Sequence, residues 1–216
     1  MVLAMLCVGM MGCAEQSEGR GNEQKEEGSR KAVVKAKKKQ VGTPPLTIYL
    51  YDDFPWKRAE ELAQDLRVIF PKVTISDLRL RLPAKAYNKV RNRYLGSALL
   101  DDLRTRLNGD VALGLTDEII YKPNEISGTY GIMGVSYVNR NVAVSSLTIP
   151  RSGAKQDRKT FFKLTLHEVG HAYGLPHCPN QKCIMVDAEH RNKLKNITSF
   201  CADCKAKLVK RGWKIK

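Results

Sequence analysis

The sequence predicts an α/β fold built on a mixed β-sheet. Short runs of β-branched and aromatic residues alternate along the chain with longer stretches in which apolar residues recur at every third or fourth position. The first pattern is typical of strands and the second of amphipathic helices. Their alternation predicts a sheet that is covered by helices.

The first strand is predicted at 46–52, where the run LTIYLYD has the composition of a buried strand. A helix begins at Pro55 and continues to residue 70. Its predicted apolar face consists of Trp56, Ala59, Leu62, Leu66 and Ile69. A second strand follows at 72–80. The residues expected to point inward from it are Val73, Ile75 and Leu78.

The second half of the chain alternates in the same way. A helix is predicted at 95–107, with a leucine at every fourth position, and a third strand at 111–115. Two further strands, at 130–137 and 142–149, flank a turn. The last predicted helix, 157–173, contains the residues with the strongest chemical signal.

Three of the four histidines in the chain lie in the stretch HEVGHAYGLPH, residues 167–177. His167 and His171 are four positions apart, so on a helix they project from one face and can bind one metal ion. Gly174 suits the left-handed conformation that ends a helix, and the turn would bring His177 back as a third ligand. Three protein ligands leave one position for water, as in catalytic zinc sites.

Glu168 lies about 100° around the helix from His167, beside the expected metal rather than on it. A carboxylate in that place can accept a proton from a metal-bound water. The complete spacing H-E-x-x-H-x-x-G-x-x-H resembles the signature of the metzincins. The alternative is a buried helix with incidental histidines, whose imidazoles and carboxylate would then need other partners to offset their burial.

Four cysteines follow or flank this motif: Cys178, Cys183, Cys201 and Cys204. Two close pairs separated by a gap suit a closed, tetrahedral zinc site with four thiolate ligands. The alternatives are two disulfides, or one disulfide and a redox-active CxxC pair, which an oxidising compartment would favour. We favour zinc because the spacing of both pairs is similar to that of zinc ribbons.

Together these motifs resemble the archaemetzincin (archaelysin) family of metzincin zinc metallopeptidases. The family has a cysteine directly after the third histidine, then a C-x-M segment and a later CxxC. These features correspond to HEVGHAYGLPHC, to Cys183-Ile184-Met185 and to Cys201-Ala202-Asp203-Cys204. Weaker similarity extends over residues 45–205.

The resemblance implies a minimal metzincin catalytic domain that acts on peptide or protein substrates. In that fold a mixed, twisted sheet with an antiparallel edge strand packs on helices, which include the HExxH helix. The resemblance implies two zinc ions per chain. The catalytic zinc would be bound by His167, His171 and His177, with Glu168 as the general base and Met185 as the Met-turn residue beneath the metal. The structural zinc would be bound by Cys178, Cys183, Cys201 and Cys204.

The edge strand is expected in the glycine-rich stretch GTYGIMGVSYV, residues 128–138. Its exposed backbone would pair with an extended peptide by strand addition. Gly131 and Gly134 would then let the peptide backbone approach closely. The other explanation of these glycines is a hairpin with bulges.

Residues 1–13 are predicted to be a signal peptide. The apolar run is too short to cross a bilayer of ~30 Å as a helix, and Met10-Met11-Gly12-Cys13 resembles a lipobox, whose cysteine is lipidated. Residues 14–44 contain no aromatic residue and predict a disordered linker, so that 45–216 form the peptidase domain. We expect an exported cell-envelope protein tethered to the membrane through Cys13. A secreted protein, or a cytoplasmic one if the start codon is mis-set, is the alternative.

The formal net charge is +15, and much of the excess lies after residue 190. A basic tail of this kind would suit anionic lipid, acidic substrates or nucleic acid. Because few aromatic residues lie among its basic side chains, we expect a solvated face or weak membrane contact, and no nucleic-acid partner. His190 is expected at the surface, and the chain is expected to be a monomer.

These features favour a zinc metallopeptidase that hydrolyses peptide bonds with a zinc-activated water and Glu168 as general base. The alternative is a non-catalytic zinc-binding module that retains the fold. Glu168 is evidence against that alternative, because a purely structural site needs no carboxylate there. A nucleic-acid-binding protein would leave the three histidines without a role.

Overall fold

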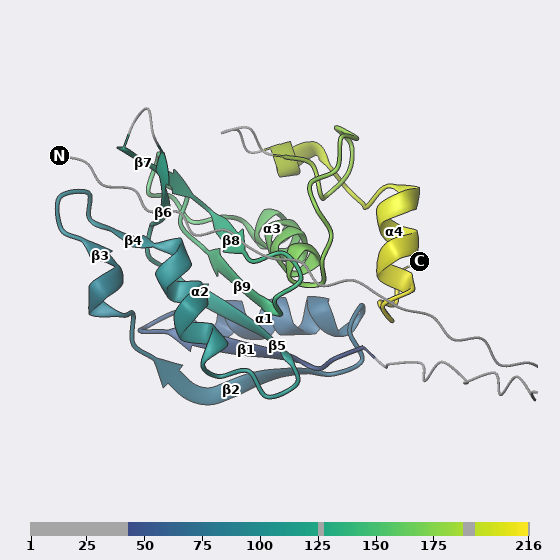
Figure 1. Cartoon of the computed structure of the whole chain (residues 1–216), viewed down its shortest axis with the longest axis horizontal. Coiled ribbons are helices and arrows are strands. Elements are labelled where there is room, and N and C mark those ends of the chain that lie inside the picture. Colours follow the sequence, from purple (N-terminus) through teal and green to yellow (C-terminus); the bar gives the residue numbers. More distant parts are fainter. Residues whose placement is uncertain (1–42, 125–127, 188–192, 216) are drawn as a thin grey trace, which may run out of the picture. The chain divides into compact units, whose positions relative to one another are not determined.

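The computed structural model describes residues 43–124, 128–187 and 193–215. The predicted signal peptide, all but the last two residues of the predicted linker, and His190 lie outside the described residues. Strands and helices intermix up to β5, four further strands from β6 to β9 follow, and α3 and α4 lie in the last part of the chain (Figure 1). No helix among the described residues is long and apolar enough to cross a membrane.

The central sheet has five strands in the order β2-β1-β5-β9-β8. Four of them are parallel: β2 (Val73–Leu80), β1 (Leu46–Tyr51), β5 (Val111–Thr116) and β9 (Val142–Ser146). The edge strand β8 (Gly134–Ser136) pairs antiparallel with β9. The prediction of a mixed sheet with an antiparallel edge strand is therefore confirmed.

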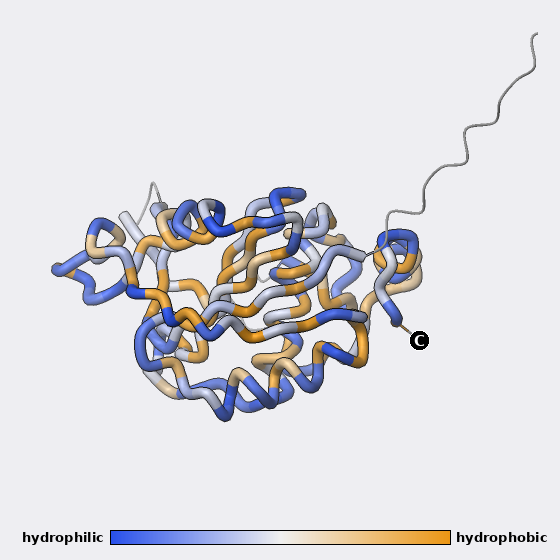
Figure 2. The backbone as a smooth tube through the Cα atoms, turned by 90° about the horizontal axis from the view of Figure 1, so that it is seen from below, coloured by the Kyte–Doolittle hydropathy of each residue, from blue (hydrophilic) through white to orange (hydrophobic). Residues whose placement is uncertain are grey.

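Helices cover both faces of this sheet. α1 (Trp56–Arg67) and α3 (Arg158–Ala172) pack on the face that carries Leu113, whereas α2 (Gly96–Arg104) packs on the face that carries Val144. Successive side chains of a strand point to opposite faces, so each face has its own hydrophobic core. In Figure 2 the hydrophobic stretches follow the central strands, and hydrophilic ones follow the outer turns of the helices.

A second sheet, which the sequence pattern did not predict, contains four strands in the order β3-β4-β6-β7. They are β3 (Tyr87–Asn88), β4 (Arg93–Leu95), β6 (Ile120–Asn124) and β7 (Gly128–Ile132). The single strand predicted at 130–137 is thus divided at Met133, because β7 pairs with β6 and β8 pairs with β9. Strands of two to five residues are too short for alternation to reveal them.

Two residues that were predicted to point inward are exposed. Leu78 is 56% exposed, and it lies where the register between β1 and β2 shifts, which breaks the alternation of side chains. Trp56 is 46% exposed at the first turn of α1. The other residues of the predicted α1 face are buried or partly buried. Near the carboxyl end, the short helices η2 (Lys193–Asn196) and α4 (Ala202–Val209) were not predicted.

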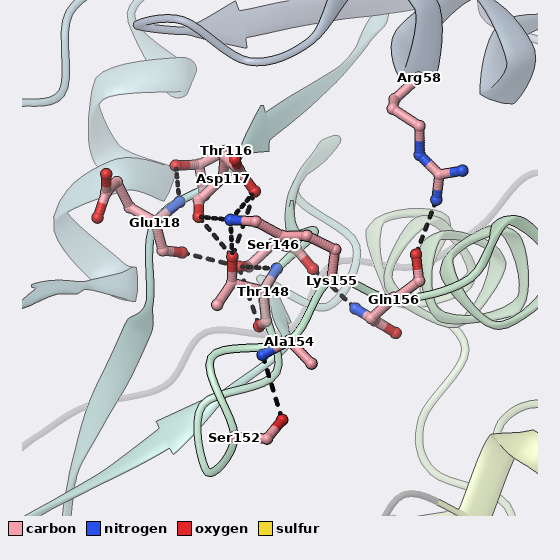
Figure 3. A network of polar contacts seen from close by, with 10 residues as sticks. All are labelled: Arg58, Thr116, Asp117, Glu118, Ser146, Thr148, Ser152, Ala154, Lys155 and Gln156. Atoms are coloured by element: carbon pink, nitrogen blue, oxygen red, sulfur yellow. Dashed lines mark hydrogen bonds and ion pairs between the residues drawn. The ribbon is translucent and has the colours of Figure 1, made fainter.

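A polar network fixes the segment between β9 and α3 (Figure 3). Lys155 Nζ lies 2.6 Å from Asp117 Oδ1 and donates to Thr148 Oγ1 at 2.8 Å. Gln156 Nε2 donates to the Ser146 carbonyl at 2.8 Å. These groups lie at the carboxyl ends of β5 and β9, so the network sets where α3 begins relative to the sheet.

A buried lysine fastens the carboxyl-terminal segment to α3. Lys163 Nζ donates to the carbonyls of Leu194, Lys195 and Ile197 at 2.6, 3.0 and 2.7 Å. Burial lowers the pKa of Lys163. The three carbonyls lie in and just after η2, so the ammonium meets the negative end of a helical turn.

Replacing Lys163 with Met should lower the free energy of unfolding by about 2–4 kcal/mol, because three carbonyls lose their donor while the site stays buried. Urea denaturation measures the change. Lys159→Met is the matched control, since Lys159 is exposed one turn earlier on the same helix. The control should change stability by less than about 0.5 kcal/mol. Equal losses in both variants would contradict the anchoring role of Lys163.

Candidate active site

The helix that carries the HExxH sequence has a defined start and end. Its N-cap, Asp157, accepts hydrogen bonds from the Thr160 hydroxyl at 2.7 Å and the Thr160 backbone at 2.9 Å, and these two bonds lower the pKa of Asp157. The helix ends at Ala172, and Gly174 has a φ of +90°. The predicted glycine turn is therefore present, because this φ is one that glycine adopts without strain.

The turn brings the three predicted histidines together. The ligand nitrogens of His167, His171 and His177 lie within 4.8 Å of one another. His167 and His171 are buried, and His177 is exposed. The cluster is therefore open to solvent on the side of His177.

The outward-facing nitrogen of each buried ring is engaged by a backbone carbonyl. Nδ1 of His167 lies 2.7 Å from the carbonyl oxygen of Ile184, and Nδ1 of His171 lies 2.6 Å from that of Leu175. A carbonyl can only accept, so Nδ1 must carry the proton in both rings. Each Nε2 is then left with a lone pair, as a metal-ligating histidine requires.

These two lone pairs face each other. Nε2 of His167 and Nε2 of His171 are 3.0 Å apart. Two such lone pairs repel unless a cation lies beside both. Nitrogens that bind one tetrahedral zinc ion at about 2.0–2.1 Å are separated by roughly 3.3 Å. The two rings thus have both the protonation state and the spacing that suit zinc.

Burial keeps both rings neutral. It lowers the pKa of His167 to about 4 and that of His171 to about 4, against the opposite effect of the hydrogen bonds to the carbonyls. Neutral imidazole is the form that binds metal. Protons therefore compete for these nitrogens only in acid solution.

The third histidine is oriented by a carboxylate that sequence reasoning did not assign. His177 Nδ1 lies 3.3 Å from Asp187 Oδ2. A carboxylate on Nδ1 leaves Nε2 available as a ligand atom. The signal that could have indicated Asp187 is its place two residues after Met185, in the segment that returns beneath the histidines.

Glu168 is buried beside the histidines. Ser136 Oγ donates to its Oε2 at 2.9 Å. Burial raises the pKa of Glu168, and the neighbouring His171 and the hydrogen bond from Ser136 oppose that rise. The carboxylate therefore holds a proton more readily than an exposed glutamate does, a property that suits a group that takes up and releases one.

The glycines of the predicted edge strand have a structural explanation. A Cβ on Gly134 would lie 2.5 Å from Glu168 Oε1, and a Cβ on Gly131 would overlap Pro150. Both positions need glycine because neighbouring side chains fill the space. A substitution of Gly134 would disturb Glu168 directly, so it cannot test whether a peptide approaches the strand.

The four predicted cysteines also come together. Their sulfur atoms lie within 4.8 Å of one another, and all four are free thiols in the structure. Cys178 Sγ and Cys201 Sγ are 3.8 Å apart. Two sulfurs on one tetrahedral zinc ion, at about 2.3 Å each, are also separated by roughly 3.8 Å. The backbone N–H groups of Met185 and Cys201 point at Cys183 Sγ, as suits a thiolate acceptor. The cluster fits a zinc ion better than two disulfides.

Residues 57–210 match the sequence pattern of peptidase family M54. The chain belongs to this family. Among its relatives, the archaemetzincin of Methanopyrus kandleri is 36% identical over 148 residues, which are 65% of this chain and 82% of that protein. The archaemetzincin of Pyrococcus horikoshii is 32% identical over 141 residues, 58% of this chain and 70% of that protein.

Solved archaemetzincin structures have the same fold. The crystal structure from Methanopyrus kandleri matches with a TM-score of 0.66 and 26% identity, over 79% of this chain and 97% of that chain. The structure from Archaeoglobus fulgidus matches with a TM-score of 0.60 and 27% identity, over 75% and 99%. The archaemetzincin resemblance is therefore confirmed, and this M54 member is a zinc metallopeptidase, a hydrolase.

In this M54 chain one short segment connects the histidine and cysteine clusters. Ile184 accepts the hydrogen bond of His167 through its carbonyl, and its own N–H donates to the carbonyl of Ser199 at 3.0 Å. Cys178 N donates to the Met185 carbonyl at 2.7 Å. Met185 is fully buried. A shift of this segment would move groups of both clusters.

Gly170 makes room for Met185, because a Cβ there would lie 2.7 Å from Met185 Sδ. Gly170→Ala should therefore destabilise the protein. Alanine is favoured in a helix by about 1 kcal/mol, but overpacking a filled core costs about 1–3 kcal/mol. Urea denaturation of Gly170→Ala, Met185→Ala and the double variant measures the coupling. The double variant should be more stable than the sum of the single losses predicts. A stabilising Gly170→Ala would contradict the tight contact.

Proposed function

We propose that His167, His171 and His177 hold the catalytic zinc of this peptidase and that Glu168 is its general base. The observation that carries this proposal is that Nε2 of His167 and Nε2 of His171 lie 3.0 Å apart, each with a free lone pair, beside the buried carboxylate of Glu168. When bound, zinc supplies a Lewis acid that polarises the scissile carbonyl and lowers the pKa of a bound water toward ~7.

The chain's own groups then move the proton. Glu168 follows ligand His167 directly in the sequence, and it projects beside the histidines rather than between them. It takes a proton from the attacking water and later passes it to the leaving amine. His167 and His171 stay neutral throughout because burial lowers their pKa values, and the carbonyls keep the single proton of each ring on Nδ1.

We further propose that the peptide substrate lies along β8. This strand is the last of the central sheet, so one of its edges has no partner strand among the described residues. An extended peptide can add to such an edge through main-chain hydrogen bonds. Gly134 and Ser136 of β8 both contact Glu168, so a peptide paired there would pass close to the proposed base.

A second, structural zinc is proposed at the four-cysteine cluster. The Cys178–Cys201 sulfur separation, which matches a tetrahedral site, and the N–H groups aimed at Cys183 Sγ support it. Through Ile184 and Met185 this cluster would hold the segment that accepts the hydrogen bond of His167. The second zinc would thus support the first without contacting it.

Glu168→Gln should lower kcat/KM by about 10²–10⁴-fold, because the water loses its base. Zinc content by mass spectrometry should not change. Cleavage of a peptide library, with and without chelator, measures the activity. Glu60→Gln, an exposed position on α1, is the control and should cleave normally. A fully active Glu168→Gln would exclude Glu168 as base. A wild-type protein that binds zinc but cleaves nothing would favour the non-catalytic zinc module.

Cys201→Ser should release the second zinc and also weaken the first. Loss of the groups that hold metal ligands in place typically lowers metal affinity by about 10–100-fold. We therefore expect the affinity of the histidine cluster for zinc to fall by about that factor in a chelator competition assay. Ser199→Ala is the control, because Ser199 contacts this segment through its backbone carbonyl, which accepts from the Ile184 N–H and is kept in the variant. The wild type should hold two zinc ions. One zinc and four titratable thiols in the wild type would exclude the structural site.

Cellular placement is proposed from the sequence. An export signal at 1–13, lipidation of Cys13 and the linker 14–44 would tether a monomeric peptidase to the membrane of the cell envelope. Mass spectrometry of the mature amino terminus is the test. A diacylated terminal Cys13 supports the tether, and an unprocessed Met1 excludes it.

A further inference from the structure

Strand β8 presents two residues to Glu168. Because side chains alternate along a strand, Gly134 and Ser136 face α3, whereas Val135 faces the other way. The side chain of Val135 packs close to Gly96 at the start of α2. One face of the three-residue strand therefore lies against the proposed base, and the other packs in the core.

Gly134 and Ser136 constrain the carboxylate in different ways. Ser136 Oγ donates to Glu168 Oε2 at 2.9 Å. At Gly134, a Cβ would lie 2.5 Å from Oε1 and 2.6 Å from Cγ of Glu168. One oxygen therefore has a donor, and the other lies where only glycine leaves enough space.

A buried carboxylate with one free oxygen has several orientations open to it. A glutamate side chain has three rotatable bonds, and fixing it costs conformational entropy. A hydrogen bond to a charged acceptor is among the stronger ones in proteins. The bond from Ser136 therefore favours one rotamer and leaves Oε1 as the oxygen that remains to accept a proton.

We propose that Ser136 is a positioning residue, which holds Glu168 in the orientation that accepts the proton of the attacking water. This inference rests on the proposed role of Glu168 as general base. By this proposal Ser136 contacts neither the metal ligands nor the reacting atoms. It acts through Glu168 alone.

The test is the steady-state kinetics of Ser136→Ala in the full-length, zinc-loaded protein with a peptide from the library digest. A misplaced base slows the chemical step and not binding. We expect kcat to fall about tenfold, as for loss of one hydrogen bond to a charged group, with KM within about twofold. Unchanged kcat, or a raised KM with unchanged kcat, would overturn the proposal.

Two further variants separate positioning from stability. Ser136→Thr keeps the hydroxyl and suits a strand, so it should restore kcat to within about threefold of the wild type. Ser145→Ala is the matched control. Ser145 lies opposite Gly134 on the neighbouring strand, and its hydroxyl faces Thr165 of α3 rather than Glu168. Equal losses in Ser145→Ala and Ser136→Ala would show a general effect of the sheet and overturn the proposal.

Failure of this inference is distinguishable from failure of the proposed function. An inactive Glu168→Gln together with a fully active Ser136→Ala would exclude Ser136 and keep Glu168 as base. An active Glu168→Gln would exclude the base itself. Gly134→Ala gives an independent check, because its Cβ should displace Glu168. We expect it to lose at least as much kcat as Ser136→Ala and to keep its zinc.

Discussion

Two hydrogen bonds from histidine rings to backbone carbonyls hold the site together. Each bond sets the orientation of one ring, sets its tautomer and leaves an Nε2 lone pair aimed at its neighbour. The carbonyls belong to different segments, Leu175 in the turn after α3 and Ile184 in the segment between the cysteines. A shift of either segment would therefore change the orientation of one histidine ring.

Three residues of α3 are unfavourable for the stability of a buried helix but are needed for this arrangement. Gly170 is a poor helix former in the middle of a helix, yet its missing side chain admits Met185. Lys163 is a buried cation, yet its three carbonyl contacts attach the segment that leads to the second cysteine pair. Glu168 is a buried carboxylate. Such conflicts with ordinary helix and core preferences are expected where a site is built.

The local features of the site were predictable because their physics is local. Ligands four apart on a helix share a face whatever surrounds them, and a glycine after the last turn permits the reversal that returns His177. The order along the chain of the strands and helices that build the central sheet also followed from periodicity. The second sheet did not, since its strands are short. Nor did the division at Met133, because a continuous apolar and glycine-rich stretch carries no mark of which neighbour it pairs with.

The sequence by itself determined which residues are candidates for the chemistry of a zinc peptidase: the three histidines, Glu168 and the four cysteines, each by type and spacing. Only the tertiary structure decided what surrounds them. Ser136 reaches Glu168 across 32 positions of sequence, and Lys163 reaches Ile197 across 34. Contacts of that range depend on how the sheet and helices pack. No spacing rule encodes them, because the intervening chain can differ in length without changing the contact.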